Sequence, residues 1–438
     1  MLLLRSIFTN NYKQLGSMMK ELLISQNSHW RGIKQDFIKR DKLSTLIEYL
    51  PLKQIITISG IRRCGKSSLA KQAINYLIES GINPYNILFV NLEQPYFLEY
   101  KHDANYLNTI YEEYLKLANP LGKVYVIFDE IQFFSNWQVF IKSKYESSDI
   151  KFIITGSNSS MLSNDLNTLL SGRSLNIHLD TFSFNEFLNF KQINYSNEIE
   201  KISNKIAIKR AVEEYMNWGG FYEVFSIENE NLKKEILLSY VKNIIYQDII
   251  PRYGIRNSEI IERLFFYLLS NSTTILNYTT LSKIFEISDK TIKEYINYFE
   301  DVFLLKRVDK FHNKEKEQIK SQKKIYTLDN GLLQLSTNFS SNLGIKLENL
   351  VFNVLNQNEK NLTYLRDTYE IDFYTNKTLY QVSYKIDDEK TLNRELNSFK
   401  YFDMDFTKEH KLITLNDSKK INNVSVISID EFILSPIQ

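Results

Sequence analysis

One short segment, residues 60–67 with the sequence GIRRCGKS, constrains the fold of this chain more than any other feature. It matches the pattern G-x-x-x-x-G-K-[ST] and lies between an apolar run at residues 56–59 and a helical pattern that ends near Gly81. In such a loop the glycines let the backbone curl around phosphate oxygens, and the N-terminus of the next helix adds partial positive charge. Because the chain contains only 13 glycines, this spacing favours a phosphate-binding loop over a simple turn before a helix.

The loop supplies candidate ligands for a nucleotide and for Mg²⁺. We expect Lys66 to reach the β- and γ-phosphates of ATP and the Ser67 hydroxyl to bind the metal ion. Cys64 is the only cysteine, which excludes an intrachain disulfide and is typical of a cytoplasmic protein. We expect alkylation of this thiol to block ATP binding. The full set of expected nucleotide contacts in the loop is Gly60, Arg62, Arg63, Cys64, Gly65, Lys66, Ser67 and Ser68.

A second apolar run, VYVIFD at residues 124–129, is followed by Glu130, so that it ends in an acidic pair. At the carboxyl end of a parallel strand, Asp129 can bind Mg²⁺ directly or through water, and Glu130 can polarise the attacking water. This pattern is typical of a Walker B strand. The alternative is a strand that ends in two solvated acids, and the phosphate loop upstream favours the catalytic interpretation.

Five β-branched runs alternate with helical patterns from residue 54 onward, which predicts a parallel sheet covered by helices. The runs are residues 56–59, 87–92, 124–129, 152–155 and 175–179. The second to fourth are nearly continuous apolar runs, as expected for strands buried on both faces. We therefore predict an N-terminal segment at residues 1–53 and an α/β P-loop ATPase domain at residues 54–190.

Two further positions could complete the site. The fourth run leads into TGSN at residues 155–158, where Asn158 could sense the γ-phosphate or only cap a loop. The segment SGR at residues 171–173 offers Arg173 as a charge stabiliser, in cis or toward a neighbouring subunit, with a structural role as the alternative.

The chain after residue 190 divides into three predicted blocks. Residues 191–257 have helical patterns broken at Gly219 and Gly220 and ending before Pro251, and we interpret them as a helical lid or connector. Residues 258–330 show a helix, a short helix, a turn, another helix opened by Asp289, and two strands across a lysine-rich loop. This order predicts a winged helix-turn-helix. Residues 344–438 mix helices and strands.

Charge limits the partners that this chain can attract as a whole. Lys and Arg number 54 and Asp and Glu 52, so the net charge is +2 and any DNA contact must be local. The expected sites are the second helix of the winged helix, which carries a mixed set of charges including Glu294, and the basic loop at residues 314–324. A solvated loop is the alternative for the latter. No apolar stretch approaches the length of a membrane helix, so we expect no membrane association.

Taken together, these motifs resemble a broad bacterial and archaeal family of AAA-like P-loop ATPases. The family carries GxRRxGKS, a hydrophobic strand into DE, then TGS, SGR and GGF-x-E, and this chain has all of them, the last at residues 219–223. The similarity continues through YQDIIPRYGIRN at residues 246–257 and LENLVFNVL at residues 347–355. The resemblance implies an additional-strand P-loop sheet with a catalytic Glu beside the Walker B Asp. It also implies a winged helix and a C-terminal domain of unknown function.

That C-terminal block also resembles a restriction-endonuclease-type core, with a helix Glu, a strand E-x-D and a following strand (D/E/Q)-x-K. Ser383 stands where the catalytic lysine is expected, which weakens the case for a nuclease. Strand alternation would place Lys385 on the same face as Gln381 and could restore the lysine. The resemblance therefore implies a degenerate nuclease site more readily than an active one, formed by Glu348, Glu370, Asp372, Gln381 and Lys385.

These features support three hypotheses. The first is a Mg²⁺-dependent ATPase whose nucleotide state repositions the winged helix and C-terminal domain on a partner, with DNA as the candidate. The second is a nucleotide-gated signalling switch with negligible turnover. The third is an ATP-gated DNA nuclease. Assembly into a homo-oligomer is left open.

Overall fold

The computed structural model describes residues 17–103, 105–158, 172–336, 343–359, 361–404 and 407–435. Ser171 of the predicted SGR segment lies outside these ranges. The chain forms two compact units, the first of Met1–Ile61 and Gly65–Leu179 and the second of Arg62–Cys64 and Asp180–Gln438. Among the described residues, no helix combines the length and the apolar character needed to cross a membrane.

The first unit is built on a parallel sheet of five strands in the order β2-β3-β4-β1-β5. Every residue of β3 and β4, and all but the last of β2, is buried, as their apolar runs predicted, and β1 is also fully buried. Strand β4 lies between β1 and β3, so the sheet has the additional strand and the predicted α/β P-loop NTPase fold is confirmed. The strands are β1 (Ile55–Ser59), β2 (Ile87–Asn91), β3 (Val124–Asp129), β4 (Ile150–Gly156) and β5 (Ser174–His178).

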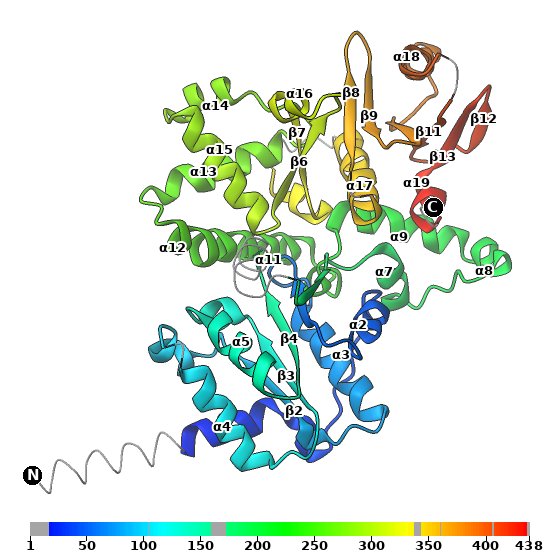
Figure 1. Ribbon diagram of the computed structural model, residues 1–438. Helices are drawn as coiled ribbons and strands as arrows, with labels where there is room; N and C mark the ends of the chain where they lie inside the picture. The colour runs from blue at the N-terminus through cyan, green and yellow to red at the C-terminus, as the bar shows by residue number, and fades with distance from the viewer. Residues whose placement is uncertain are drawn as a thin grey trace, which may run out of the picture. The chain divides into compact units, whose positions relative to one another are not determined.

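Helices cover both faces of this sheet. Figure 1 shows α2 (Leu43–Tyr49) and α3 (Lys66–Glu79) on one side and α4 (Tyr106–Ala118) and α5 (Trp137–Ser147) on the other. Apolar side chains of α4 and α5, such as Ile110 and Phe140, join Val126, Phe128 and Ile154 of the sheet in one core cluster. Burial of this cluster holds the carboxyl ends of the strands in place.

The edge strand β2 is covered by the segment before α2. Asn27 donates its side-chain amide to the Phe89 carbonyl (2.9 Å) and accepts from the Phe89 N–H (2.7 Å). Trp30 donates its indole N–H to the Ile87 carbonyl (2.9 Å). The side chains thus occupy edge groups that would otherwise be open to another strand.

The second unit begins with helices. They are α7 (Phe184–Phe190), α8 (Glu198–Ser203), α9 (Lys205–Trp218), α10 (Tyr222–Phe225), α11 (Glu230–Asn243), α12 (Ile250–Tyr253), α13 (Ser258–Ser270), α14 (Tyr278–Phe285) and α15 (Asp289–Asp301). Helix α7, which the sequence analysis placed with the ATPase domain, groups with this unit because Phe187 packs against Tyr215 of α9 and Phe225 of α10. The elements from α13 to β7 follow the order expected for a winged helix, and that assignment stays a prediction.

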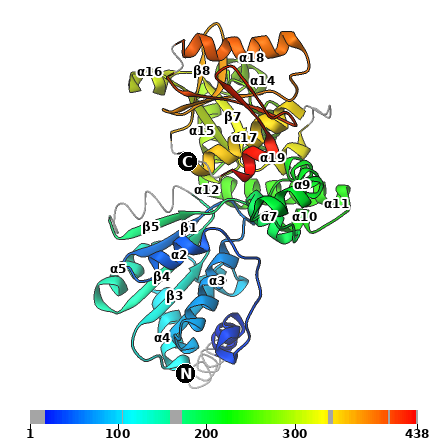
Figure 2. The same ribbon diagram turned by 90° about the vertical axis from the view of Figure 1, so that its right-hand side faces the viewer.

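An eight-stranded sheet completes the second unit, in the order β12-β13-β11-β10-β9-β8-β6-β7. Figure 2 shows α18 on one face of this sheet and α17 and α19 on the other. The two strands of the predicted winged helix, β6 and β7, belong to the same sheet as the C-terminal strands, so the sheet runs across the predicted boundary at residues 330–344. The elements are β6 (Leu305–Lys310), α16 (Glu315–Lys320), β7 (Lys323–Thr327), α17 (Leu343–Asn358), β8 (Thr363–Arg366), β9 (Glu370–Tyr374), β10 (Thr378–Val382), α18 (Glu389–Phe402), β11 (Glu409–Thr414), β12 (Lys419–Ile421), β13 (Val424–Ser428) and α19 (Ile429–Leu434).

The helix that was expected to stop before Pro251 instead changes its pitch. Between α11 and α12 the residues Ile244–Ile249 form a π-helical segment, and Pro251 lies in the first turn of α12. Proline is tolerated in a first turn because its missing N–H has no helical partner there. Short π-helical segments are frequent at functional sites.

The buried carboxylate of Asp329 fixes the turn at Gly219 and Gly220. It accepts hydrogen bonds from the Thr181 hydroxyl (2.7 Å), the Gly220 N–H (2.8 Å) and the Gly331 N–H (2.8 Å). Gly220 must be glycine for lack of space, since a Cβ there would lie 2.3 Å from the Phe182 carbonyl oxygen. These contacts join the helices of the second unit to the end of β7.

We expect Gly220→Ala to destabilise the second unit by about 2 kcal/mol, because a backbone carbonyl cannot move aside as a side chain can. The thermal midpoint should fall by about 4–8 °C in calorimetry. Gly254→Ala is the matched control, because a Cβ at Gly254 meets nothing within 4 Å and only its left-handed φ of +62° is strained, at a cost of about 1 kcal/mol. A midpoint for Gly220→Ala above that of the control would contradict the close packing of this turn.

Candidate nucleotide-binding site

The loop at residues 60–67 connects the carboxyl end of β1 to the first turn of α3, as predicted. Gly65 is the N-cap of α3 with a φ of +99°, and a Cβ at this position would lie 2.7 Å from a guanidinium nitrogen of Arg40. Arg40 is buried, and its backbone N–H donates to the Gln72 side chain of α3 (3.1 Å). No local sequence pattern connects Arg40 with Gly65, which lies 25 residues later, so this contact could not be predicted.

Lys66 lies inside the loop rather than in solvent. Its ammonium donates to the carbonyl oxygens of Gly60 and Ile61, both at 3.2 Å, and lies 3.3 Å from a carboxylate oxygen of Glu130. Both side chains are buried. A phosphate in the loop would therefore compete with a carboxylate and two carbonyls for this ammonium.

Asp129 forms the centre of the site. The Ser67 hydroxyl donates to one carboxylate oxygen (2.7 Å) and the Thr155 hydroxyl to the other (2.6 Å). Burial and the neighbouring charge of Glu130 raise the pKa of Asp129 to about 6, against these hydrogen bonds and Lys66, which lower it. The Ser67 hydroxyl and the Asp129 carboxylate are hard oxygen donors of the kind that Mg²⁺ prefers, so the pair fits the expected metal.

Glu130 is held in an uncommon backbone conformation. Its φ is +56°, in the left-handed region that non-glycine residues seldom adopt and that recurs at functional sites. Its N–H donates to the Thr155 hydroxyl (3.0 Å), and Gln132 donates to its carboxylate and to the Ser157 hydroxyl (3.1 Å). Thr155 and Gln132 thus position the acidic pair. The TGS motif at residues 155–157 pointed to Thr155 as a site residue, whereas no sequence motif identified Gln132.

The remaining loop residues group with the second unit. Arg62 lies 3.3 Å from the Asp248 carboxylate in the π-helical segment, and Arg63 lies 3.4 Å from the Glu223 carboxylate. Both guanidinium groups are thus paired with acids, and their contact with a nucleotide stays a prediction. Cys64 is buried, so alkylation of its thiol requires the loop to open. The roles of Gly60, Gly65 and Ser68 toward a nucleotide also stay predictions.

Asn158 and Arg173, the other two predicted site residues of the first unit, lie at opposite edges of the sheet. Asn158 is buried just beyond the end of β4, beside Ser157, which places it at the carboxyl edge of the sheet. Arg173 lies at the opposite edge, because its carbonyl accepts from Ile55 at the start of β1, about 13 Å along the strand from the loop. Its guanidinium pairs with Glu146 (2.7 Å). A role in cis for Arg173 is therefore wrong for this arrangement, and a role toward a neighbouring subunit stays a prediction.

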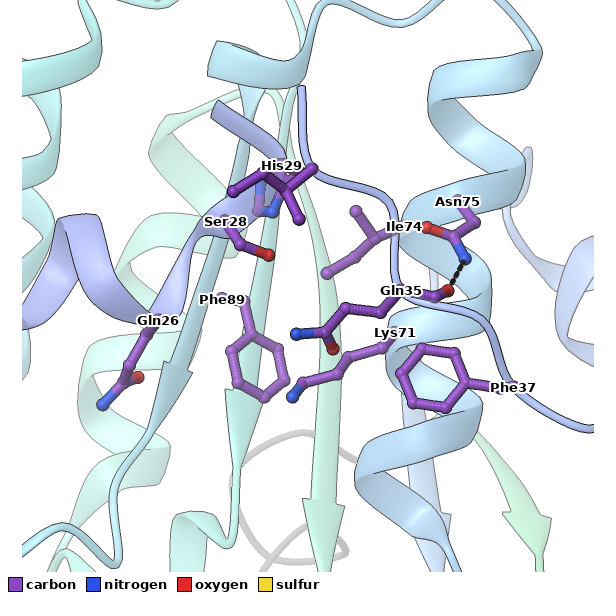
Figure 3. A pocket seen from close by; sticks show the side chains of 10 residues that line it. Gln26, Ser28, His29, Gln35, Phe37, Lys71, Ile74, Asn75 and Phe89 are labelled. Carbon is purple, nitrogen blue, oxygen red and sulfur yellow. Dashed lines mark hydrogen bonds between the residues drawn. The ribbon is translucent and has the colours of Figure 1, made fainter. Parts of the chain in front are cut away.

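The small cavity in Figure 3 is a separate feature of the first unit. It lies between the segment before α2 and the side of α3, with Gln35, Phe37, Lys71 and Phe89 among its lining residues. Its free volume of about 20 Å³ has room for one water molecule. It is too small for a nucleotide, and its lining includes none of the loop residues.

In the second unit, the predicted acids Glu348, Glu370 and Asp372 come together around a residue that the sequence analysis assigned elsewhere, Lys324. Gln381 is adjacent, since its side-chain oxygen accepts from the Asp372 N–H (3.2 Å).

Lys385, in contrast, is exposed and does not join this group through any described contact. The expectation for it was wrong because β10 ends at Val382, so strand alternation does not extend to residue 385.

Two of the five lysines in the basic loop at residues 314–324 are paired with acids, so fewer of them can contact DNA than the sequence pattern indicated. Lys324 is buried and Lys323 pairs with Asp309 (2.6 Å), which leaves Lys314, Lys316 and Lys320 exposed. The intervening Glu315 and Glu317 begin α16. Helix α15 carries four acids and two lysines, a net charge of −2. Both surfaces are weaker sites for DNA phosphates than the sequence pattern indicated.

The additional strand β4, the phosphate loop after β1 and the acidic pair after β3 place this chain among the P-loop NTPases of the AAA type. Residues 52–188 match the family model of an AAA domain, and residues 209–343 match that of a domain of unknown function, DUF8612.

Uncharacterized protein MJ1544 of Methanocaldococcus jannaschii is 33% identical over 387 residues, which cover 85% of this chain and 84% of that protein. An uncharacterized protein of Haemophilus influenzae is 31% identical over 359 residues, 80% of this chain and 87% of that protein. The chain belongs to the family that these two proteins represent.

Solved structures resemble the chain only distantly. The Aeropyrum pernix ORC1 protein in complex with DNA has 11% identity and a TM-score of 0.31, and it covers 66% of this chain and 90% of its own. AMPPCP-bound DnaA from Aquifex aeolicus has 12% identity and a TM-score of 0.27, and it covers 59% of this chain and 86% of its own. Similarity at this level carries no inference about DNA or nucleotide binding in this chain.

The raised pKa of Asp129 predicts how the free energy of unfolding changes with pH. Since the folded pKa of about 6 exceeds the ordinary value of 3.8, folding penalises the ionised carboxylate, and this penalty grows as the pH rises from about 4 to above 6. It reaches at most about 3 kcal/mol at pH 8 and about half of that at pH 5. Asp129→Asn should therefore raise the free energy of unfolding of the nucleotide-free protein, more at pH 8 than at pH 5.

Urea unfolding at the two pH values, followed by tryptophan fluorescence, measures this difference. Asp149→Asn is the control, because Asp149 is an exposed acid at the start of β4. If Asp129→Asn is less stable than the wild type at pH 8, the hydroxyls of Ser67 and Thr155 outweigh the burial of the charge.

Proposed function

We propose that this chain binds ATP with Mg²⁺ and hydrolyses it at the carboxyl edge of the first sheet. The observation that carries this proposal is the continuous network from Lys66 through Glu130 and Thr155 to Asp129 and Ser67. Lys66, Asp129 and Glu130 are buried and Ser67 is partly buried, so the residues proposed as phosphate ligand, metal ligands and base are linked in one network. The AAA domain match at residues 52–188 supports the same function.

The residues of the network have distinct roles in this proposal. Ser67 and Asp129 would hold Mg²⁺, which would neutralise phosphate charge when bound. Lys66 exchanges its contacts with Glu130 and the loop carbonyls for the β- and γ-phosphates. Because that exchange removes the ammonium from Glu130, the freed carboxylate can accept a proton from the attacking water. Thr155 and Gln132 keep Glu130 and Asp129 oriented.

We further propose that the nucleotide state is communicated to the second unit through Arg62. A γ-phosphate beside the loop would compete with Asp248 for the Arg62 guanidinium. Asp248 lies in the π-helical segment, and short segments of this kind are frequent at functional sites. The part of the chain that responds would be the helices α11 and α12 that flank this segment.

Glu130→Gln should bind ATP as the wild type does and lose at least about 100-fold in single-turnover hydrolysis, because the amide cannot accept the proton. Lys66→Ala should lose nucleotide binding itself. Fluorescent nucleotide titration and phosphate release measure the two properties.

Glu79→Gln is the matched control, since Glu79 ends the same helix as an exposed acid paired with Lys34. Equal turnover in Glu130→Gln and the wild type would remove Glu130 as the base. ATP binding with no turnover even in the wild type would favour the nucleotide-gated switch over the enzyme.

DNA remains the proposed partner of the second unit, with the exposed lysines 314, 316 and 320 as its phosphate contacts. Three contacts predict that the logarithm of the binding constant falls with the logarithm of salt concentration with a slope of about −2.7. Titration of duplex DNA at two salt concentrations, with and without ATP, measures the slope and its dependence on nucleotide. If the triple alanine variant keeps the wild-type slope, DNA does not contact this loop.

A further inference from the structure

The strongest unassigned feature of the second unit is the buried ammonium of Lys324 on β7. It lies 2.6 Å from a carboxylate oxygen of Glu370, 3.1 Å from Asp372 and 3.2 Å from Glu348. Its side chain is 3% exposed. The ammonium donates hydrogen bonds to Glu348 and Asp372 and forms an ion pair with Glu370, so all three acids are in contact with one cation.

Other groups also contact these acids, and the Tyr326 hydroxyl shares one Glu348 oxygen with Lys324. Arg366 lies 3.3 Å from the second oxygen of Glu370, the Val382 N–H donates to Asp372 (3.0 Å), and the Tyr326 hydroxyl donates to Glu348 (2.9 Å). Burial raises the pKa of Glu348 to about 7, so this acid holds a proton for much of the time near neutral pH. Two cations and the remaining two carboxylates then balance in charge.

These three acids are the positions at which a restriction-endonuclease-type core would hold a metal ion. Across the part of the chain that the structure describes, no group of three or more His, Cys, Asp or Glu side chains is arranged to hold a metal. The Ser383 hydroxyl, at the position expected for the nuclease lysine, donates to the carbonyl of Lys385 (3.1 Å). The centre of the cluster is taken by an ammonium from another strand.

We propose that Lys324 is the permanent cation of this cluster and takes the place of a divalent metal. The cluster is then a metal-free centre that ties β7 to α17 and β9, and it has no capacity to cut DNA by a metal-assisted reaction. A divalent ion can enter only if the ammonium leaves, and removing one partner of a buried ion pair leaves buried charge uncompensated.

The test is a Mn²⁺ titration of the full chain without nucleotide, followed by the electron paramagnetic resonance signal of free Mn²⁺. The wild type and Asp372→Asn should bind Mn²⁺ to the same extent, because Asp372 is already occupied. Lys324→Ala should gain one site with at least tenfold higher affinity than any in the wild type. Lys324→Ala with Asp372→Asn should lose it again.

Lys323→Ala is the matched control, because this neighbouring lysine of β7 pairs with Asp309 outside the cluster. Circular dichroism establishes whether Lys324→Ala is folded, and a folded variant that gains no site overturns the proposal. If Lys324→Ala does not fold, the comparison of the wild type with Asp372→Asn decides. Mn²⁺ binding or Mn²⁺-dependent DNA cleavage that Asp372→Asn reduces tenfold or more overturns the proposal, and equality of the two proteins supports it.

Discussion

The buried carboxylate of Asp129 is the interaction on which the candidate site depends. Through Ser67 it is tied to the first turn of α3, and through Thr155 to the end of β4. Because β4 lies between β1 and β3, the carboxyl ends of three strands meet at this point. An ionised carboxylate is costly to bury, so its two hydroxyl donors are needed for the site to persist without a cation.

Lys66 and Lys324 are both buried, but their charges are compensated by different partners. Lys66 has one carboxylate and two carbonyls as partners, and a phosphate offers a stronger charge-assisted contact than a carbonyl does. Lys324 lies among three acids, and removing it would leave the charged carboxylates of Glu370 and Asp372 without this cation. The first environment therefore permits exchange with a ligand, whereas the second opposes it.

The sequence predicted those features that short segments encode. Strand positions, the loop and the acidic pair each depend on residues within about ten positions of one another. The partners of Lys324 lie 24 to 48 residues away, so its charge was interpreted as part of a DNA-binding loop. The prediction that Lys385 joins the acids failed for a related reason, because the end of β10 depends on pairing with other strands. No sequence pattern identified Arg40 or Gln132 as part of the site.

The energetics of the loop arginines indicate which of them can carry a signal. Arg63 and Glu223 are about half exposed, and a pair of this kind contributes at most about 1 kcal/mol. Arg62 and Asp248 are nearly buried, and leaving one such partner uncompensated costs several times more. A ligand that drew Arg62 away would therefore remove a nearly buried ion pair from the π-helical segment. This makes Arg62, rather than the more exposed Arg63, the residue through which nucleotide binding would alter the second unit.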